Sequence, residues 1–158
     1  MSDDFSAGRL ANFISAWCKI TSDNKLLDII QHCHIEFVNN IKPCRPYLQN
    51  RNFNGKETLI IDAEIKKLLD QDVIKLVQFD EKQFLSPIFL KLKKNNEYRL
   101  ILNLKDLNAF IPYRHFKMDT LENVITLVRK DMYMASIDIR HAYYSILMAE
   151  EDQLYLRF

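Results

Sequence analysis

The chain has 158 residues, of which 48% are apolar and 27% are charged, and its 22 basic and 21 acidic side chains leave a formal net charge of +1. These values are typical of one globular domain, or of one domain and part of a second. The only glycines, Gly8 and Gly55, cannot form the clustered turn of a phosphate-binding or dinucleotide-binding loop, and no run reaches the roughly 18 apolar residues that span a bilayer.

Helical spacing occurs twice near the N-terminus. Residues 9–18 are expected to form the first helix, and its apolar positions are Leu10, Phe13, Ile14 and Trp17. Residues 22–32 are expected to form the second, with Ser22 or Asp23 as its cap and an apolar stripe at Leu26, Leu27 and Ile30.

Residues 39–58 hold two prolines, five asparagines and Gly55, a composition typical of a linker. We therefore expect a helical segment at 1–41, a linker at 42–58 and the main unit at 59–158. In the main unit, Asp62 is expected to cap a helix running to about Leu69, and residues 73–77 to form a short strand.

The clearest local pattern is a β-hairpin. Residues 86–94 and 97–103 are two extended runs joined through Asn95-Asn96. Along the first run, Ile88, Leu90 and Leu92 are expected on one face and Phe89, Lys91 and Lys93 on the other. Along the second run, Tyr98, Leu100 and Leu102 alternate with Arg99 and Ile101. Lys93 and Arg99 then lie near the hairpin tip and reach into the same space.

The last part of the chain alternates helical and extended patterns. Asp119 or Thr120 is the expected cap of a helix whose buried positions are Leu121, Val124, Ile125 and Val128. Strands are expected at 132–138, 145–148 and 154–158, with a turn or helix start over His141–Ser145. An apolar strand that runs to the final residue suggests that the chain is a fragment.

Charge is distributed unevenly along the sequence. Residues 81–117 carry eight basic and three acidic side chains, and residues 118–158 carry four and seven. A basic stretch before an acidic one fits a polyanion held beside a cation-binding carboxylate. The same counts also fit an ordinary solvated face.

Asp138 is the leading candidate for chemistry, because a carboxylate at the end of an apolar strand needs a partner such as a metal ion. A helix-capping role is the alternative. Tyr143 can stack on a sugar or base, or belong to the core. Lys93 and Arg99 suit phosphate binding, although basic residues at a hairpin tip can also serve solubility alone.

The cysteines and histidines give weaker signals. His32, Cys33 and His34 are adjacent, and adjacent side chains do not easily converge on one ion, so a structural zinc site is not favoured. Cys18 and Cys33 lie on predicted apolar faces and are expected in the core. Three cysteines, an odd number, argue against a disulfide framework and favour an intracellular location, cytoplasm or nucleus.

The order of five segments resembles the fingers and first palm segment of a retroelement reverse transcriptase, most closely the DIRS-type tyrosine-recombinase retrotransposons. These segments are FLSPIFLKLKK, YRLILNLKDLN, HFKMDTLENV, ASIDIRHAYYSI and YLRF. The resemblance covers residues from about 60 to 158 and implies an α+β chain: a partial right-hand polymerase preceded by a short helical segment. The segment just before it, GRLANFISAW followed by KITSDNKLLDII, supports the DIRS-type assignment.

The resemblance also implies roles for individual residues. Asp138 matches the first catalytic aspartate, which binds Mg²⁺, and the main-chain carbonyl of Ile139 is a further metal ligand. Tyr143 matches the aromatic residue that selects deoxynucleotides by excluding the 2′-hydroxyl. Lys93 and Arg99 match the cations that hold the triphosphate of the incoming dNTP, and an RNA or DNA template-primer is the other partner.

Two-metal phosphoryl transfer needs ions about 4 Å apart, and the family supplies further aspartates from a later Asp-Asp turn. No Asp-Asp pair follows Asp138, and the later palm, the thumb and any RNase H segment are missing from the resemblance. We therefore expect that the chain alone does not polymerise DNA. The alternatives are a non-catalytic remnant that binds nucleic acid through residues 81–117, and a fragment that folds poorly because of an incomplete sheet.

Overall fold

The computed structural model describes residues 5–49, 52–93, 96–139 and 141–158. Its mixture of helix and strand agrees with the expected α+β class. None of the described helices is long and apolar enough to cross a membrane. The elements in chain order are η1 (Arg9–Phe13), α1 (Ile14–Trp17), α2 (Asn24–Gln31), η2 (Val38–Asn40), α3 (Gly55–Asp70), β1 (Ile88–Leu92), β2 (Tyr98–Leu102), α4 (Lys105–Asn108), α5 (Leu121–Leu127), η3 (Ala142–Ser145) and η4 (Glu150–Tyr155).

The structure confirms one of the two predicted N-terminal helices and only part of the other. The second is confirmed as α2, because the Asp23 side chain accepts hydrogen bonds from the amides of Lys25 and Leu26 and Ile30 is buried. The first is only partly confirmed, since residues 9–13 are a 3₁₀ helix and α1 adds only four residues of α-helix.

Helix α3 starts seven residues before Asp62, so the predicted start was wrong. The Asn54 side chain accepts the Glu57 amide at 3.0 Å, and the Glu57 carboxylate accepts the Asn54 amide at 3.0 Å. This reciprocal capping box satisfies two helix-terminal donors. Its signal, Asn-x-x-Glu, lies within the segment predicted as a linker.

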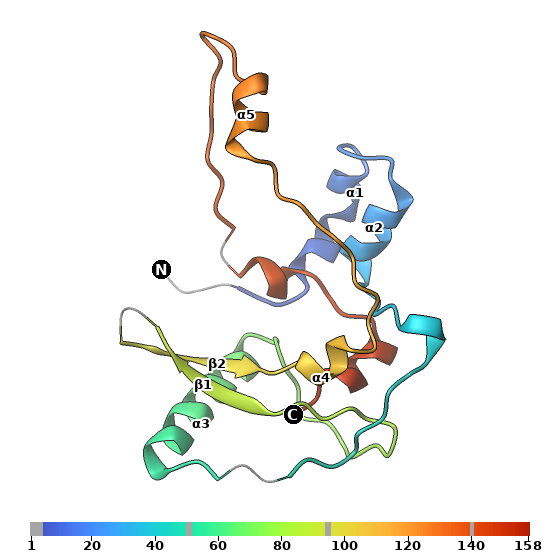
Figure 1. Cartoon of the computed structure of the whole chain (residues 1–158), viewed down its shortest axis with the longest axis vertical. Helices are drawn as coiled ribbons and strands as arrows, with labels where there is room; N and C mark the ends of the chain where they lie inside the picture. The colour runs from blue at the N-terminus through green and yellow to red at the C-terminus, as the bar shows by residue number, and fades with distance from the viewer. Residues whose placement is uncertain (1–4, 50–51, 94–95, 140) are drawn as a thin grey trace.

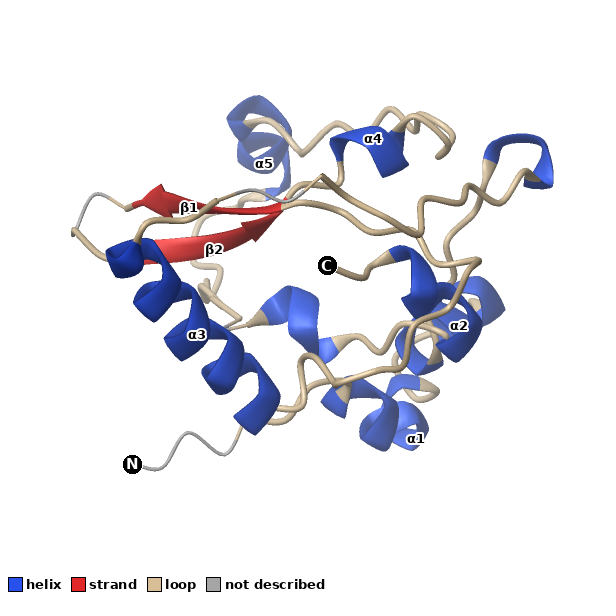
Figure 2. Cartoon of the chain, turned by 90° about the horizontal axis from the view of Figure 1, so that it is seen from below, coloured by secondary structure: helices blue, strands red, loops and turns tan. Residues whose placement is uncertain are grey.

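The β-hairpin is confirmed in its strands, pairing and faces. β1 and β2 are antiparallel, with Ile88 opposite Leu102, Leu90 opposite Leu100 and Lys91 opposite Arg99. Helix α3 runs alongside the hairpin and contacts β2 (Figure 2). The alternation was reliable because both strands are neighbours in sequence. Of the predicted connection Asn95-Asn96, Asn95 lies outside the described residues.

The core joins four segments that are distant in sequence. Phe37, Phe84, Leu107 and Tyr155 are buried against one another. The rings of Phe37 and Tyr155 meet edge to face with centroids 4.7 Å apart. Single parallel bridges connect Arg45 with Phe84, Leu85 with Arg157 and Cys33 with Met148. The core and these bridges therefore pack segments near the two ends of the chain against the central segment that contains Phe84 and Leu107.

Three predicted short strands were wrong. Residues 73–77 are a turn followed by irregular chain, and Leu76 and Val77 are exposed. Residues 145–148 end the 3₁₀ helix η3 and make one isolated bridge, and most of 154–158 belongs to η4 or to a second bridge. Each run is apolar, but none of them pairs with a strand over more than one residue in the described structure.

Residues 113–139, here called the arm, project away from the rest of the chain (Figure 1). Thr120 caps α5 as predicted, by accepting the Asn123 amide at 3.3 Å. The predicted burial of α5 was wrong, because every residue of the arm is exposed, Leu121 by 74%. The predicted strand 132–138 was also wrong: this part of the arm is irregular and pairs with no strand among the described residues.

Candidate functional site

The tip half of the hairpin carries a pair of directly opposed cations. Lys91 of β1 lies opposite Arg99 of β2, and both side chains are exposed. Like charges in this position repel each other and destabilise the strand pair by about 0.2–1 kcal/mol. Neither has a carboxylate within salt-bridge distance in the described ranges. An anion bound between them would remove the repulsion.

Lys93, the second predicted phosphate ligand, follows β1 and already has a partner. Its Nζ lies 3.1 Å from Oε2 of Glu97, and its amide donates to the Glu97 carbonyl at 2.7 Å. An exposed pair of this kind contributes about 0–1 kcal/mol, so a phosphate can compete for the ammonium group. Lys94 lies outside the described residues.

Asp138 lies in the descending part of the arm and is exposed, as is Ile139. Because Asp138 is exposed to solvent, the burial cost that would require a partner for its carboxylate does not arise. It remains accessible to a cation or to a nucleotide approaching from solvent.

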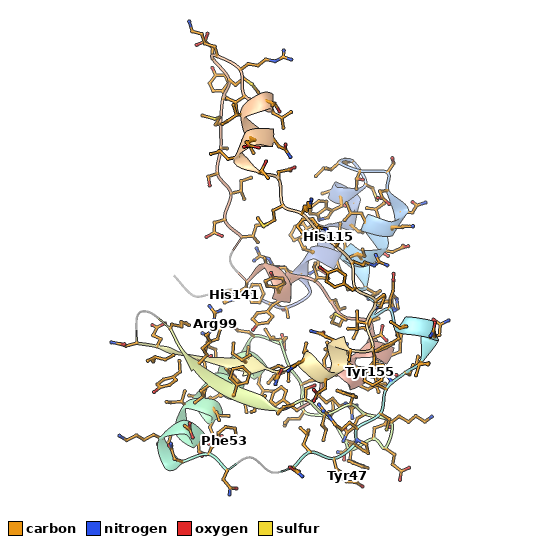
Figure 3. The ribbon with its side chains drawn as sticks, viewed as in Figure 1. Tyr47, Phe53, Arg99, His115, His141 and Tyr155 are labelled. Atoms are coloured by element: carbon orange, nitrogen blue, oxygen red, sulfur yellow. The ribbon has the colours of Figure 1, made fainter. Side chains whose placement is uncertain are left out.

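Tyr143 lies in η3, whose turn is confirmed, and its ring is 94% exposed. The turn begins at His141, which adopts left-handed backbone angles, with φ of 56°. The His141 carbonyl accepts the Tyr144 amide at 3.0 Å and the Ser145 hydroxyl at 3.2 Å. In the view of Figure 3, the side chain of Arg99 on the hairpin lies below the turn that carries His141.

The oxygen donors of Asp138 and Ile139 are of the type that Mg²⁺ prefers. No group of three or more His, Cys, Asp or Glu side chains gathers around a metal position within the described ranges. These two donors are of a suitable type, but the described residues do not gather the set of ligands that a two-ion arrangement needs.

His34, which the sequence presented beside Cys33, belongs to a carboxylate cluster. Its Nδ1 lies 3.3 Å from the buried Asp152 and 3.4 Å from Glu151. Asp152 also accepts the Ile35 amide at 2.9 Å. The contacts join segments more than a hundred residues apart, which no sequence spacing indicated.

Beside this cluster, the pKa values of a thiol and a phenol are raised above their ordinary values. Burial raises the pKa of the Cys33 thiol, and the negative charge of Asp152 adds to the effect. Burial, followed by the charges of Asp152 and Cys44, raises the pKa of the Tyr155 phenol. Cys33 is half-buried, but Cys18 is exposed, so its predicted place in the core was wrong.

Arg45 was missed by the sequence reasoning. Its Nε donates to the Leu85 carbonyl at 2.7 Å, its Nη1 lies 2.6 Å from Asp106, and its guanidinium lies over the Phe84 ring at 4.3 Å. These contacts anchor the predicted linker to both ends of the hairpin region. The partners of Arg45 lie 40 and 61 positions further along the chain, so no local spacing indicated these contacts.

The described surface also has a shallow hollow, which lies apart from the predicted site residues and is lined by Ile35, Glu36, Phe37, Asn40, Lys42 and Pro112.

Comparisons of the chain with protein-family models, with curated proteins and with solved structures found no match.

Proposed function

We propose that this chain is the nucleotide-binding, N-terminal part of an RNA-directed DNA polymerase of a retrotransposon. The observation that carries the proposal is the cross-strand pair Lys91 and Arg99, two exposed cations held opposite each other on a hairpin. The sequence order that resembles reverse transcriptases supplies the rest of the assignment. Template-directed nucleotidyl transfer then belongs to the full enzyme, with Mg²⁺, dNTP and a template-primer as its partners.

The chemistry assigned to each residue follows from its side chain. The planar guanidinium of Arg99 suits two phosphate oxygens at once, whereas Lys91 and Lys93 act as point charges. Asp138 offers carboxylate oxygens to the magnesium ion that accompanies a triphosphate. The exposed ring of Tyr143 can lie against the sugar, where its bulk would disfavour a 2′-hydroxyl.

Binding of a fluorescent dATP to the whole chain in the presence of Mg²⁺ tests this proposal. A charge-assisted hydrogen bond to phosphate contributes about 1.5–3 kcal/mol, so Arg99→Ala is expected to weaken binding by about tenfold or more. Lys75→Ala is the control, because Lys75 is an exposed cation outside the hairpin. Equal effects of the two substitutions, or no binding by the unmodified chain, would contradict the proposal.

The second candidate is a module that binds nucleic acid without catalysis, and the positive balance of residues 81–117 favours it. Phosphate-dominated binding of single strands weakens with salt, with a log–log slope of about −0.7 for each phosphate neutralised. Salt-dependent binding of an oligonucleotide that is indifferent to both Mg²⁺ and dNTP would favour this candidate over the polymerase fragment.

A further inference from the structure

The segment Phe5–Arg9, here called the strap, touches two parts of the molecule that are far apart in sequence. The Gly8 amide donates to the Tyr144 carbonyl at 2.8 Å, and the Ala7 amide donates to the Gln71 carbonyl at 3.1 Å. The first bond reaches the turn of η3, and the second reaches the C-terminal end of α3. Figure 1 shows the strap passing beside η3.

Aromatic packing adds a second link between the strap and the turn. The buried Phe5 ring lies 4.8 Å from the His141 ring, which in turn stacks on Tyr144 at 6.0 Å. The Arg9 guanidinium lies over the Phe5 ring, 5.6 Å from the ring centroid. Nε2 of His141 is buried and has no hydrogen-bond partner in the described structure. The contacts that hold the His141 ring are therefore its packing against Phe5 and Tyr144.

Gly8 is the position where the strap depends on glycine. Its φ is +70°, and an added Cβ would lie 3.2 Å from both Cβ and Cδ1 of Leu147. A side chain at this position is strained by its backbone angles and crowded by Leu147. Gly55 offers the contrast, because an added Cβ there meets nothing within 4 Å.

We propose that the strap is a positioning element for the turn His141–Ser145, and that Phe5 and Gly8 are positioning residues for the sugar-facing ring of Tyr143. The part of this inference that concerns nucleotides rests on the proposed function. The strap holds the left-handed backbone of His141 in place and couples the turn to α3. When it is displaced, the turn loses its fixed orientation, and discrimination between deoxyribose and ribose declines.

The test compares Gly8→Ala and Phe5→Ala with the matched control Gly55→Ala in the full chain. Hydrogen exchange of the Tyr144 amide reports opening of the turn, and circular dichroism reports folding. Forcing a non-glycine residue into a strained backbone region costs enough to speed local opening by about tenfold. We expect this acceleration in Gly8→Ala, a similar one in Phe5→Ala and no change in Gly55→Ala.

The ratio of the affinities for Mg²⁺-dATP and Mg²⁺-ATP is a second readout, and it would not change if the strap had a purely structural role. The ratio of the two affinities is expected to shrink in both strap variants and to stay constant in Gly55→Ala. If Tyr144 exchange is unchanged in both folded strap variants, the strap does not position the turn. If exchange accelerates but the ratio is constant, the link to the nucleotide is wrong.

The two proposals can fail separately. If the unmodified chain binds neither nucleotide, the proposed function is wrong, and Tyr144 exchange alone then decides whether the strap positions the turn. Because Phe5→Ala introduces no backbone strain, it still provides the test if Gly8→Ala fails to fold.

Discussion

The arm and the packed remainder of the chain contain the same kinds of apolar residues but use them differently. Around Leu107, side chains from four segments close over one another, and Leu107 is 1% exposed. In the arm, Leu121 and its neighbours on α5 meet solvent, although the helix is capped and regular. Regular secondary structure and burial are thus separate outcomes in this protein.

This contrast has a physical cause. A helix makes its hydrogen bonds within its own segment, so the cap and spacing of α5 can be recognised in the sequence, although a helix of seven residues has little stability of its own without packing. Burial needs a second surface, and the described structure packs none against α5. The tertiary contacts of the remainder come from long-range pairs, such as Phe37 with Tyr155 and Asp152 with Ile35.

The largest expected effect on stability compares the same substitution in the core and in the arm. Leu107→Ala removes a fully buried side chain and is expected to lower the free energy of unfolding by about 2–5 kcal/mol. Leu121→Ala, the same change in the arm, is expected to have an effect within about 0.5 kcal/mol. Urea denaturation followed by circular dichroism measures both. Equal losses would show that α5 is packed in solution.

Adjacent carboxylates give the next contrast. Asp152→Ala leaves the Ile35 amide without its acceptor, at an expected cost of about 1–3 kcal/mol. Glu151→Ala removes only an exposed contact to His34, and about 0–1 kcal/mol is expected. The same denaturation experiment applies. A larger effect for Glu151 would mean that the buried hydrogen bond is not formed.

Helix caps test whether an isolated helix contributes to global stability. Asn54→Ala breaks the capping box of α3, which packs beside the hairpin, so a loss of about 0.5–2 kcal/mol in unfolding free energy is expected. Thr120→Ala should speed hydrogen exchange within α5 while leaving the global unfolding transition in place. A shift of that transition would show coupling between the arm and the core.

Alkaline titration should give the smallest effect. The raised pKa values of Cys33 and Tyr155 mean that the folded state holds these protons more tightly than the unfolded state. Their contribution to stability is therefore complete below the ordinary thiol value of 9.0 and declines as pH rises through it and through the ordinary phenol value of 10.0.

Urea midpoints measured across this alkaline range should fall. Cys33→Ala should remove the thiol part of the decline, whereas Cys18→Ala, at an exposed cysteine, should leave it unchanged. A decline that persists in full without Cys33 would assign the effect to other groups.

Sequence patterns were reliable where the interacting groups are close in the chain. The alternation of residues 88–102 predicted the hairpin and the two faces of each strand, whereas the opposition of Lys91 and Arg99 was seen only in the structure. The caps at Asp23 and Thr120 were also foreseen, because each joins a side chain to an amide two or three residues away. The α3 start is equally local, since the Asn54-x-x-Glu57 pattern that marks it lies within the segment predicted as a linker.

The candidate site was predictable only as a set of residues. The sequence indicated Lys93, Arg99, Asp138 and Tyr143, but Asp138 lies on irregular exposed chain where a strand was expected. The participation of Phe5 and Gly8 could not be foreseen, because their contacts to His141 and Tyr144 cross more than 130 positions of sequence.

The sequence alone therefore determined the hairpin, α2 and the capped start of α5, since these structures make their hydrogen bonds within a few neighbouring residues. Tertiary structure decided which apolar runs became strands and which helices became buried. A strand needs a partner and a helix face needs a surface to cover it. Those requirements are met by distant parts of the chain, so local spacing does not contain them.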